Sequence, residues 1–164
     1  MSKQFSDLGI QESIIKALDD LKIVVPTEIQ QKTISLLLTT QTDLVGLAKT
    51  GTGKTAAFGL PLLQLIDSKI TDVQAVIMAP TRELGHQIFT NLEAFAKYIP
   101  EISIAETCGG IPIKPQIERL TLPTHIVVAT PGRLIDLIQR KAISLKETQF
   151  LVLDEADEMV AILK

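Results

Sequence analysis

A glycine-rich loop at residues 48–55 has the residue types that bind phosphate. Gly51 and Gly53 let backbone N–H groups turn toward phosphate oxygens, where a side chain would clash. Lys54 can reach the β- and γ-phosphates of a nucleotide, and the Thr55 hydroxyl can bind Mg²⁺. The strict phosphate-loop pattern has glycine at the position of Ala48, so this is a variant form. An ordinary strand–helix turn is the alternative, but the Gly-Lys-Thr order before a predicted helix favours phosphate binding.

A cluster of carboxylates at residues 154–157 follows a short apolar segment. Phosphoryl transfer needs a carboxylate near Mg²⁺ and a group that orients the attacking water. We expect Asp154 to bind the metal and Glu155 to act as the base. Such a cluster is also typical of the solvated start of a helix, so its meaning depends on the phosphate loop. Together the two features predict a nucleotide hydrolase.

Short apolar segments alternate with amphipathic ones along the chain, and they are the elements that must position these residues. The apolar segments are rich in Val, Ile and Leu, which is typical of strands covered by helices on both faces. Their order predicts an α/β domain with a mostly parallel sheet, in which ligands bind at the carboxyl ends of the strands. Strands are expected at 43–47, 74–78, 102–106, 125–129 and 150–153, and helices at 11–21, 27–38, 53–67, 82–98, 114–120 and 132–140.

Composition excludes several classes of protein. The net charge is −3, so any nucleic-acid contact must be local, and an aromatic content of 4% argues against recognition by stacked bases. Cys108 is the only cysteine, which excludes an intramolecular disulfide and a cysteine-rich zinc site. A reducing cytoplasm is therefore the expected location. No apolar run approaches the ~20 residues that a membrane span needs, so no membrane contact is expected.

An ordered set of short segments resembles the DEAD-box RNA helicases. Asp154-Glu155-Ala156-Asp157 spells the signature of that family. The other segments are similar to its Q motif (26–30, with Phe5 upstream), phosphate loop (48–55), motif Ia (80–84), double glycine (109–110) and motif Ib (130–133). The resemblance covers the whole chain.

The resemblance implies a RecA-like three-layer sandwich with a mostly parallel central sheet flanked by helices. Residues 1–164 would be its N-terminal ATP-binding domain, with Q-motif helices in 1–42 and the phosphate-loop core in 43–164. Truncation at the C-terminal end would leave out the second RecA-like domain and its arginine finger. The family couples ATP hydrolysis to local unwinding of RNA between two such domains, so this chain alone, an expected monomer, should be nearly inactive.

The resemblance also implies site residues. The ATP-binding residues would be Ile23, Thr27, Gln30, Ala48, Lys49, Thr50, Gly51, Thr52, Gly53, Lys54 and Thr55. Gln30 would read the adenine edge, Lys54 and Glu155 would be catalytic, and Thr55 and Asp154 would bind Mg²⁺. Backbone contacts with RNA, independent of sequence, would come from Pro80, Thr81, Arg82, Gly109, Gly110, Thr130, Pro131, Gly132 and Arg133.

Three positions depart from the family pattern. The family usually has glycine and then an aromatic residue at the positions of Lys22 and Ile23, so stacking on adenine is lost here. Lys49 stands where the family often has glutamine.

Other functions stay open at this stage. A related superfamily-2 helicase or a DNA-acting motor would share the phosphate loop, but Pro80–Leu84 and the acidic signature argue against it. A kinase is disfavoured because nothing resembles a phosphate-acceptor site or lid. A nucleotide-switched module that binds RNA or a partner protein without helicase activity is the alternative from a different class.

Overall fold

A computed structural model describes residues 3–162 of the chain. The chain divides into two compact units. Unit 1 consists of Met1–Leu65 and Asn91–Pro100, and unit 2 of Ile66–Thr90 and Glu101–Lys164. We describe each unit by itself. None of the helices in the described range is long and apolar enough to cross a membrane.

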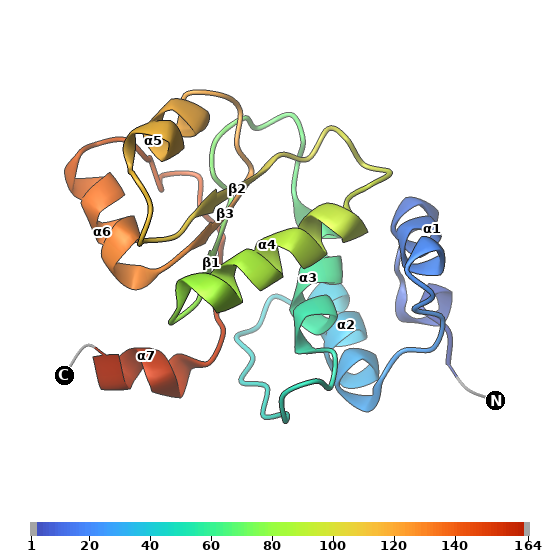
Figure 1. Cartoon of the computed structure of the whole chain (residues 1–164). Coiled ribbons are helices and arrows are strands. Elements are labelled where there is room, and N and C mark those ends of the chain that lie inside the picture. The colour runs from blue at the N-terminus through green and yellow to red at the C-terminus, as the bar shows by residue number, and fades with distance from the viewer. Residues whose placement is uncertain (1–2, 163–164) are drawn as a thin grey trace. The chain divides into compact units, whose positions relative to one another are not determined.

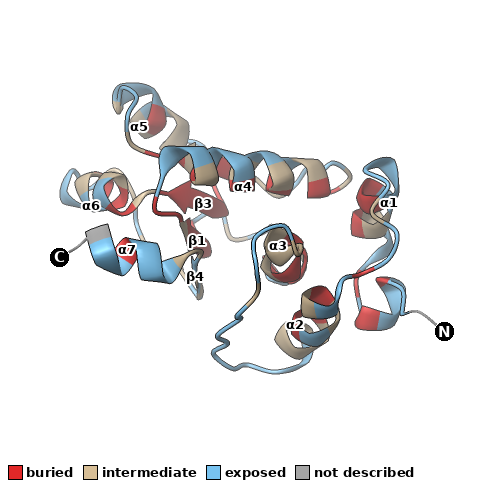
Figure 2. Ribbon diagram, turned by 60° about the horizontal axis from the view of Figure 1, so that its bottom comes forward, coloured by how far each residue is buried: buried red, intermediate tan, exposed pale blue. Residues whose placement is uncertain are grey.

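Unit 1 is helical. It contains a short 3-10 helix and three α-helices, η1 (Ser6–Leu8), α1 (Glu12–Asp20), α2 (Glu28–Thr39) and α3 (Lys54–Leu65). Leucine and isoleucine side chains of these helices are buried (Figure 2), among them Ile14, Leu18, Ile34, Leu60 and Leu63. Leu92, from the end of helix α4 (Arg82–Phe95) that belongs to this unit, is buried as well. The packing is close, because a Cβ atom added at Gly59 would lie 2.7 Å from Leu92.

Unit 2 is built on a parallel sheet. Its strands are β1 (Ala75–Met78), β2 (Ile104–Thr107), β3 (Ile126–Ala129) and β4 (Phe150–Leu153), in the order β2-β3-β1-β4. In this register Met78 lies beside Ala129 and Leu153, and Thr107 also lies beside Ala129. All four strands therefore end side by side, and we call the line of their carboxyl ends the carboxyl edge of the sheet.

Helices connect and cover these strands (Figure 1). The connecting helices are α4 (Arg82–Phe95), α5 (Lys114–Leu120) and α6 (Pro131–Gln139), and the boundary between the two units falls within α4. A last helix, α7 (Ala156–Ile162), follows β4. Leu120 of α5 and Leu134 of α6 pack on one face of the sheet, against Val76, Val127 and Ala129. β3 lies between β2 and β1, and all four of its residues are buried.

Helices α1 and α6 end in the same way. After α1, Lys22 has φ 58°, its N–H donates to the Asp19 carbonyl, and the N–H of Ile23 donates to Leu18. After α6, Lys141 has φ 56° and the N–H of the next residue, Ala142, donates to Leu137. This is the Schellman arrangement, in which the left-handed position is usually glycine. Both helices thus end on a lysine in a strained backbone conformation.

The strand predicted at 43–47 does not form. This segment has no regular structure, and Val45 and Leu47 are 85% and 91% exposed. An apolar segment fits a sheet only where a neighbouring strand supplies backbone partners, and the residue pattern does not name that partner. Gly46 weakens the segment further, because glycine in a strand has no side chain to pack and loses more backbone entropy.

Candidate functional site

The phosphate loop lies at the start of α3 in unit 1. Gly51 and Gly53 have φ 80° and 83°, conformations that a side chain disfavours. The N–H groups of Gly51 and Gly53 donate no hydrogen bond within the described part of the chain. They lie at the N-terminus of a helix of 12 residues, where unpaired N–H groups and the helix dipole attract anions. Lys54 and Thr55, the first residues of α3, are half-buried.

Side chains from the start of α2 hold the carbonyl groups of this loop. The Thr27 hydroxyl donates to the Thr52 carbonyl at 2.8 Å, and Gln30 Nε2 donates to the Gly53 carbonyl at 3.1 Å. The Thr52 hydroxyl donates to the Lys49 carbonyl at 2.6 Å. With these carbonyl oxygens occupied, the N–H groups of the loop are left for an anion.

Gln30 also stabilises the helix that carries it. Its Oε1 accepts a hydrogen bond from the Thr27 N–H at 2.9 Å, which is one half of a capping box. Gln30 is only 3% exposed, and both ends of its amide are bonded within the protein. The residue predicted to read adenine therefore links the α2 start to the phosphate loop. Ile23, the other residue assigned to the adenine site, is half-buried.

A cavity of about 420 Å³ lies beside the phosphate loop, within unit 1. One wall is the first turn of α2, and the other is the chain leading into the loop. Its lining includes four residues predicted to bind ATP together with apolar ones, and consists of Thr27, Glu28, Ile29, Lys32, Leu47, Ala48, Lys49 and Thr52. Its volume lies within the range typical of small-molecule sites.

In unit 2, each segment assigned to RNA or to catalysis follows a strand end. Residues 80–82 follow β1, residues 109–110 follow β2, residues 130–133 follow β3, and residues 154–155 follow β4. Because the strands are parallel and in register, these segments lie at the same edge of the sheet, where ligands bind in folds of this class.

Hydrogen bonds join three of these segments. The Gly109 N–H donates to the Thr130 hydroxyl at 2.9 Å, and Arg82 Nη1 lies 3.5 Å from the Gly110 carbonyl. The Thr81 hydroxyl accepts a hydrogen bond from the Leu84 N–H at 3.2 Å and so caps the start of α4. Gly110 has φ 83°, so its conformation also favours glycine. The double-glycine loop is thus held between α4 and the start of α6.

The sequence did not indicate one residue of this network. Gln116 on α5 is 5% exposed, and it contacts both the chain before Gly109 and the guanidinium of Arg133. Glutamine on a short helix usually faces solvent, so the residue type and its spacing give no sign that Gln116 is buried.

The acidic segment begins directly after β4. The Asp154 N–H donates to the Met78 carbonyl at 3.0 Å and so extends the pairing with β1. Glu155 has φ 51°, a strained conformation for a residue with a side chain, and such strain is frequent at functional sites. A side-chain hydrogen bond to Glu155, in which the protonated Glu158 carboxyl is the donor, and the repulsion between the two charges raise the pKa of Glu158. Among the described residues, no cluster of three metal-binding side chains is present.

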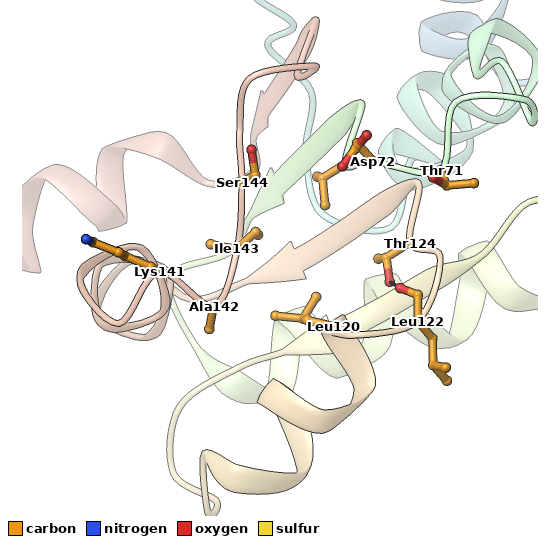
Figure 3. A pocket seen from close by; sticks show the side chains of 10 residues that line it. Thr71, Asp72, Leu120, Leu122, Thr124, Lys141, Ala142, Ile143 and Ser144 are labelled. Carbon is orange, nitrogen blue, oxygen red and sulfur yellow. Dashed lines mark hydrogen bonds between the residues drawn. The ribbon is translucent and has the colours of Figure 1, made fainter.

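A second cavity lies at the opposite edge of the sheet (Figure 3). It has a volume of about 250 Å³ and is lined by residues that precede strands, among them Asp72, Thr124 and Ser144. The Lys141 side chain points away from the other labelled side chains. The cavity therefore offers no convergent set of charged groups, and we assign no ligand to it.

Comparison with known sequences identifies the family. The profile described as DEAD/DEAH box helicase matches residues 27–162. ATP-dependent RNA helicase CshA of Listeria monocytogenes is 46% identical over 157 residues, which are 96% of this chain and 30% of that protein. ATP-dependent RNA helicase DeaD of Haemophilus influenzae is 46% identical over 156 residues, 95% of this chain and 25% of that protein.

Solved structures have the same fold. A DEAD box protein from the hyperthermophile Methanococcus jannaschii matches with a TM-score of 0.90 at 38% identity, over 99% of this chain and 44% of that one. A variant of S. cerevisiae Dbp5, bound to RNA and ADP BeF3, matches with a TM-score of 0.87 at 31% identity, over 97% of this chain and 40% of that one. The predicted α/β fold with a parallel sheet is confirmed. The chain spans only 25–30% of the length of the two bacterial relatives, CshA and DeaD. It belongs to the DEAD/DEAH box helicase family.

Proposed function

We propose that the chain is the ATP-binding part of an ATP-dependent RNA helicase, which couples ATP hydrolysis to local unwinding of RNA duplexes. The phosphate loop carries the proposal. Its two left-handed glycines and its carbonyls bonded to Thr27 and Gln30 leave N–H groups free at the start of α3. The names of the two bacterial relatives, ATP-dependent RNA helicases, support the same activity.

ATP would bind with its phosphates on this loop. Backbone N–H groups would donate hydrogen bonds to the phosphate oxygens, and Lys54 would stabilise the β- and γ-phosphates. The cavity between α2 and the loop is large enough for part of a nucleotide, and Ile29 and Leu47 give it apolar surface. Gln30 is the proposed adenine-reading residue, because an amide can both donate to and accept from the adenine edge.

Mg²⁺ would enter with the nucleotide. Hydroxyl and carboxylate oxygens are donor types that suit this ion, because Mg²⁺ prefers a few protein oxygens together with phosphate oxygens and water over a cage of protein ligands. We assign the Thr55 hydroxyl and the Asp154 carboxylate as those protein oxygens. When bound, the ion would neutralise charge on the phosphates. Glu155 would hold the water that attacks the γ-phosphate and accept its proton.

RNA would bind at the carboxyl edge of the sheet in unit 2. Arg82 and Arg133 can donate to phosphate oxygens, and the double-glycine loop allows close approach of a backbone. Such contacts carry no base information, so binding should be independent of sequence and should weaken with salt. The second RecA-like domain of a longer protein is the proposed partner across the RNA. The related Dbp5 structure contains RNA.

Two titrations test the proposal. The chain should bind ADP by calorimetry, and Lys54→Ala should weaken that binding by at least tenfold, since a phosphate loses its cation. Lys69→Ala removes an exposed lysine outside the loop and is the matched control.

Arg82→Ala and Arg133→Ala should weaken the binding of all single-stranded RNAs about equally. A chain that binds neither ADP nor RNA would contradict the proposal. RNA binding that responds to nucleotide, without unwinding by the longer protein, would favour the nucleotide-switched module.

A further inference from the structure

Gln116 is a buried polar side chain that contacts the segments we propose for RNA binding. It lies on α5 and is 5% exposed. Its Nε2 donates to the Cys108 carbonyl at 2.9 Å, and its Oε1 accepts from Arg133 Nη1 at 2.6 Å. Both ends of the amide are therefore bonded. A buried amide with only one end bonded would be destabilising, so this geometry is strongly determined.

The two partners of Gln116 belong to different segments of the chain. Cys108 ends the chain that leads into the double glycine, and Arg133 lies in the first turn of α6. Arg133 also donates from Nη2 to the Ile111 carbonyl at 2.8 Å, on the other side of the double glycine. Gln116 therefore closes a ring of hydrogen bonds that fixes the guanidinium relative to residues 108–111.

Arg133 is held by this ring without being neutralised. Its two hydrogen-bond acceptors are an amide oxygen and a backbone carbonyl, and no carboxylate pairs with it in the described part of the chain. A guanidinium has five N–H donors in a fixed fork, so donors remain on the same rigid plane. The positive charge and these donors are what a phosphate needs.

We propose that Gln116 is a positioning residue for RNA binding, which acts by orienting the Arg133 guanidinium toward a backbone phosphate. This inference rests on the proposed RNA function. It predicts that the benefit of Gln116 for RNA is lost when Arg133 is absent, whereas a residue that only stabilises the fold would act independently of Arg133.

The test is a double-mutant cycle on the full chain, read by titration of a fluorescent oligouridylate at several salt concentrations. Gln116→Met keeps the length of the side chain and removes both hydrogen bonds. Gln116→Glu keeps the acceptor and places a carboxylate beside Arg133. Glu118→Gln changes an exposed residue on the same helix and is the control. Arg133→Ala and the double variant with Gln116→Met complete the cycle.

We expect Gln116→Met to weaken RNA binding about fivefold, the factor of one hydrogen bond, and to lower the salt slope by about 1, the effect of one lost phosphate contact. Gln116→Glu should lower the slope similarly because it neutralises Arg133. The double variant should bind like Arg133→Ala alone. The inference is overturned if Arg133→Ala weakens binding while both Gln116 variants keep the wild-type affinity and slope, or if the effects simply add. If the wild-type chain binds no RNA, the proposed function fails together with it.

Discussion

Gln30 connects two backbone groups that are far apart in sequence, the N-cap of α2 and the Gly53 carbonyl. Its proposed contact with adenine would be made by the same amide. Gln30→Ala should therefore erode the preference for ADP over GDP and should cost about 1 kcal/mol of stability through the lost cap. Calorimetry with both nucleotides and thermal unfolding measure the two effects.

The neighbouring glutamine supplies the control for this prediction. Gln31 Nε2 donates to the Pro26 carbonyl at 2.9 Å, close to the same helix start but away from the loop. Gln31→Ala should leave the ratio of ADP to GDP affinity unchanged. If Gln30→Ala also leaves that ratio unchanged, adenine is read by another residue.

Cys108 is a second residue with a measurable consequence. Its side chain is fully buried, and burial, with a contribution from the Glu106 carboxylate, raises the pKa of the thiol to about 11. At pH 8 the thiolate is scarce, and reagents cannot reach the sulfur. Native protein should therefore resist iodoacetamide, whereas protein unfolded in guanidinium should be alkylated rapidly. Mass spectrometry distinguishes the two, and rapid alkylation of the native chain would contradict the burial of this residue.

At the scale of elements, the two helices that end on lysine make a stability prediction. Lys22→Gly and Lys141→Gly should each raise the free energy of unfolding by about 1 kcal/mol, because glycine adopts φ near +57° without strain. Part of this gain is offset by the greater entropy of glycine in the unfolded chain. Denaturant titration measures the change.

Alanine at the same positions separates strain from side-chain effects. Lys22→Ala and Lys141→Ala remove the charge and length of the side chain but keep a Cβ atom in the left-handed region. They should give no stabilisation. Equal gains from alanine and glycine would show that the lysine side chain, rather than the backbone, was the source of the cost.

The sequence predicted these elements to different degrees. The expected ranges 114–120 and 150–153 coincide with α5 and β4, and β4 has a backbone partner in β1. The helix expected over 82–98 ends at Phe95. Residues 96–98 continue the apolar pattern of the helix, but their backbone forms a turn. The segment 43–47 does not form a strand. Its apolar residues suggest a buried segment, but they do not specify a neighbouring strand with which the backbone could pair.

The candidate sites could likewise be predicted from sequence only in part. Residues 48–55 could be assigned from sequence because glycine and lysine at fixed spacing have a local function. The hydrogen bonds from Thr27 and Gln30 to this loop join residues more than 20 positions apart, and the proposed role of Gln116 depends on contacts with two separate segments. Interactions of this kind arise from tertiary packing, which no local spacing contains.

At the scale of the whole molecule, ATP binding and ATP hydrolysis should separate. Residues 1–164 contain the proposed phosphate-binding and acidic groups, but the family resemblance assigns the arginine finger to a second domain. Such a finger contributes about 10³–10⁵ in rate. We therefore expect the purified chain to bind ADP, to hydrolyse ATP only at a trace rate and to unwind no RNA. A phosphate-release assay with and without RNA checks this, and robust RNA-stimulated turnover would exclude it.

The position of β4 at the margin of the sheet affects how molecules of this chain behave toward one another. Within the described sheet β4 pairs with β1 alone, and Leu151 and Leu153 on it are 62% and 49% exposed. An open strand edge beside apolar side chains is a template on which a strand from another molecule can add. The strand that precedes Asp154 is therefore expected to favour aggregation of this chain at high concentration.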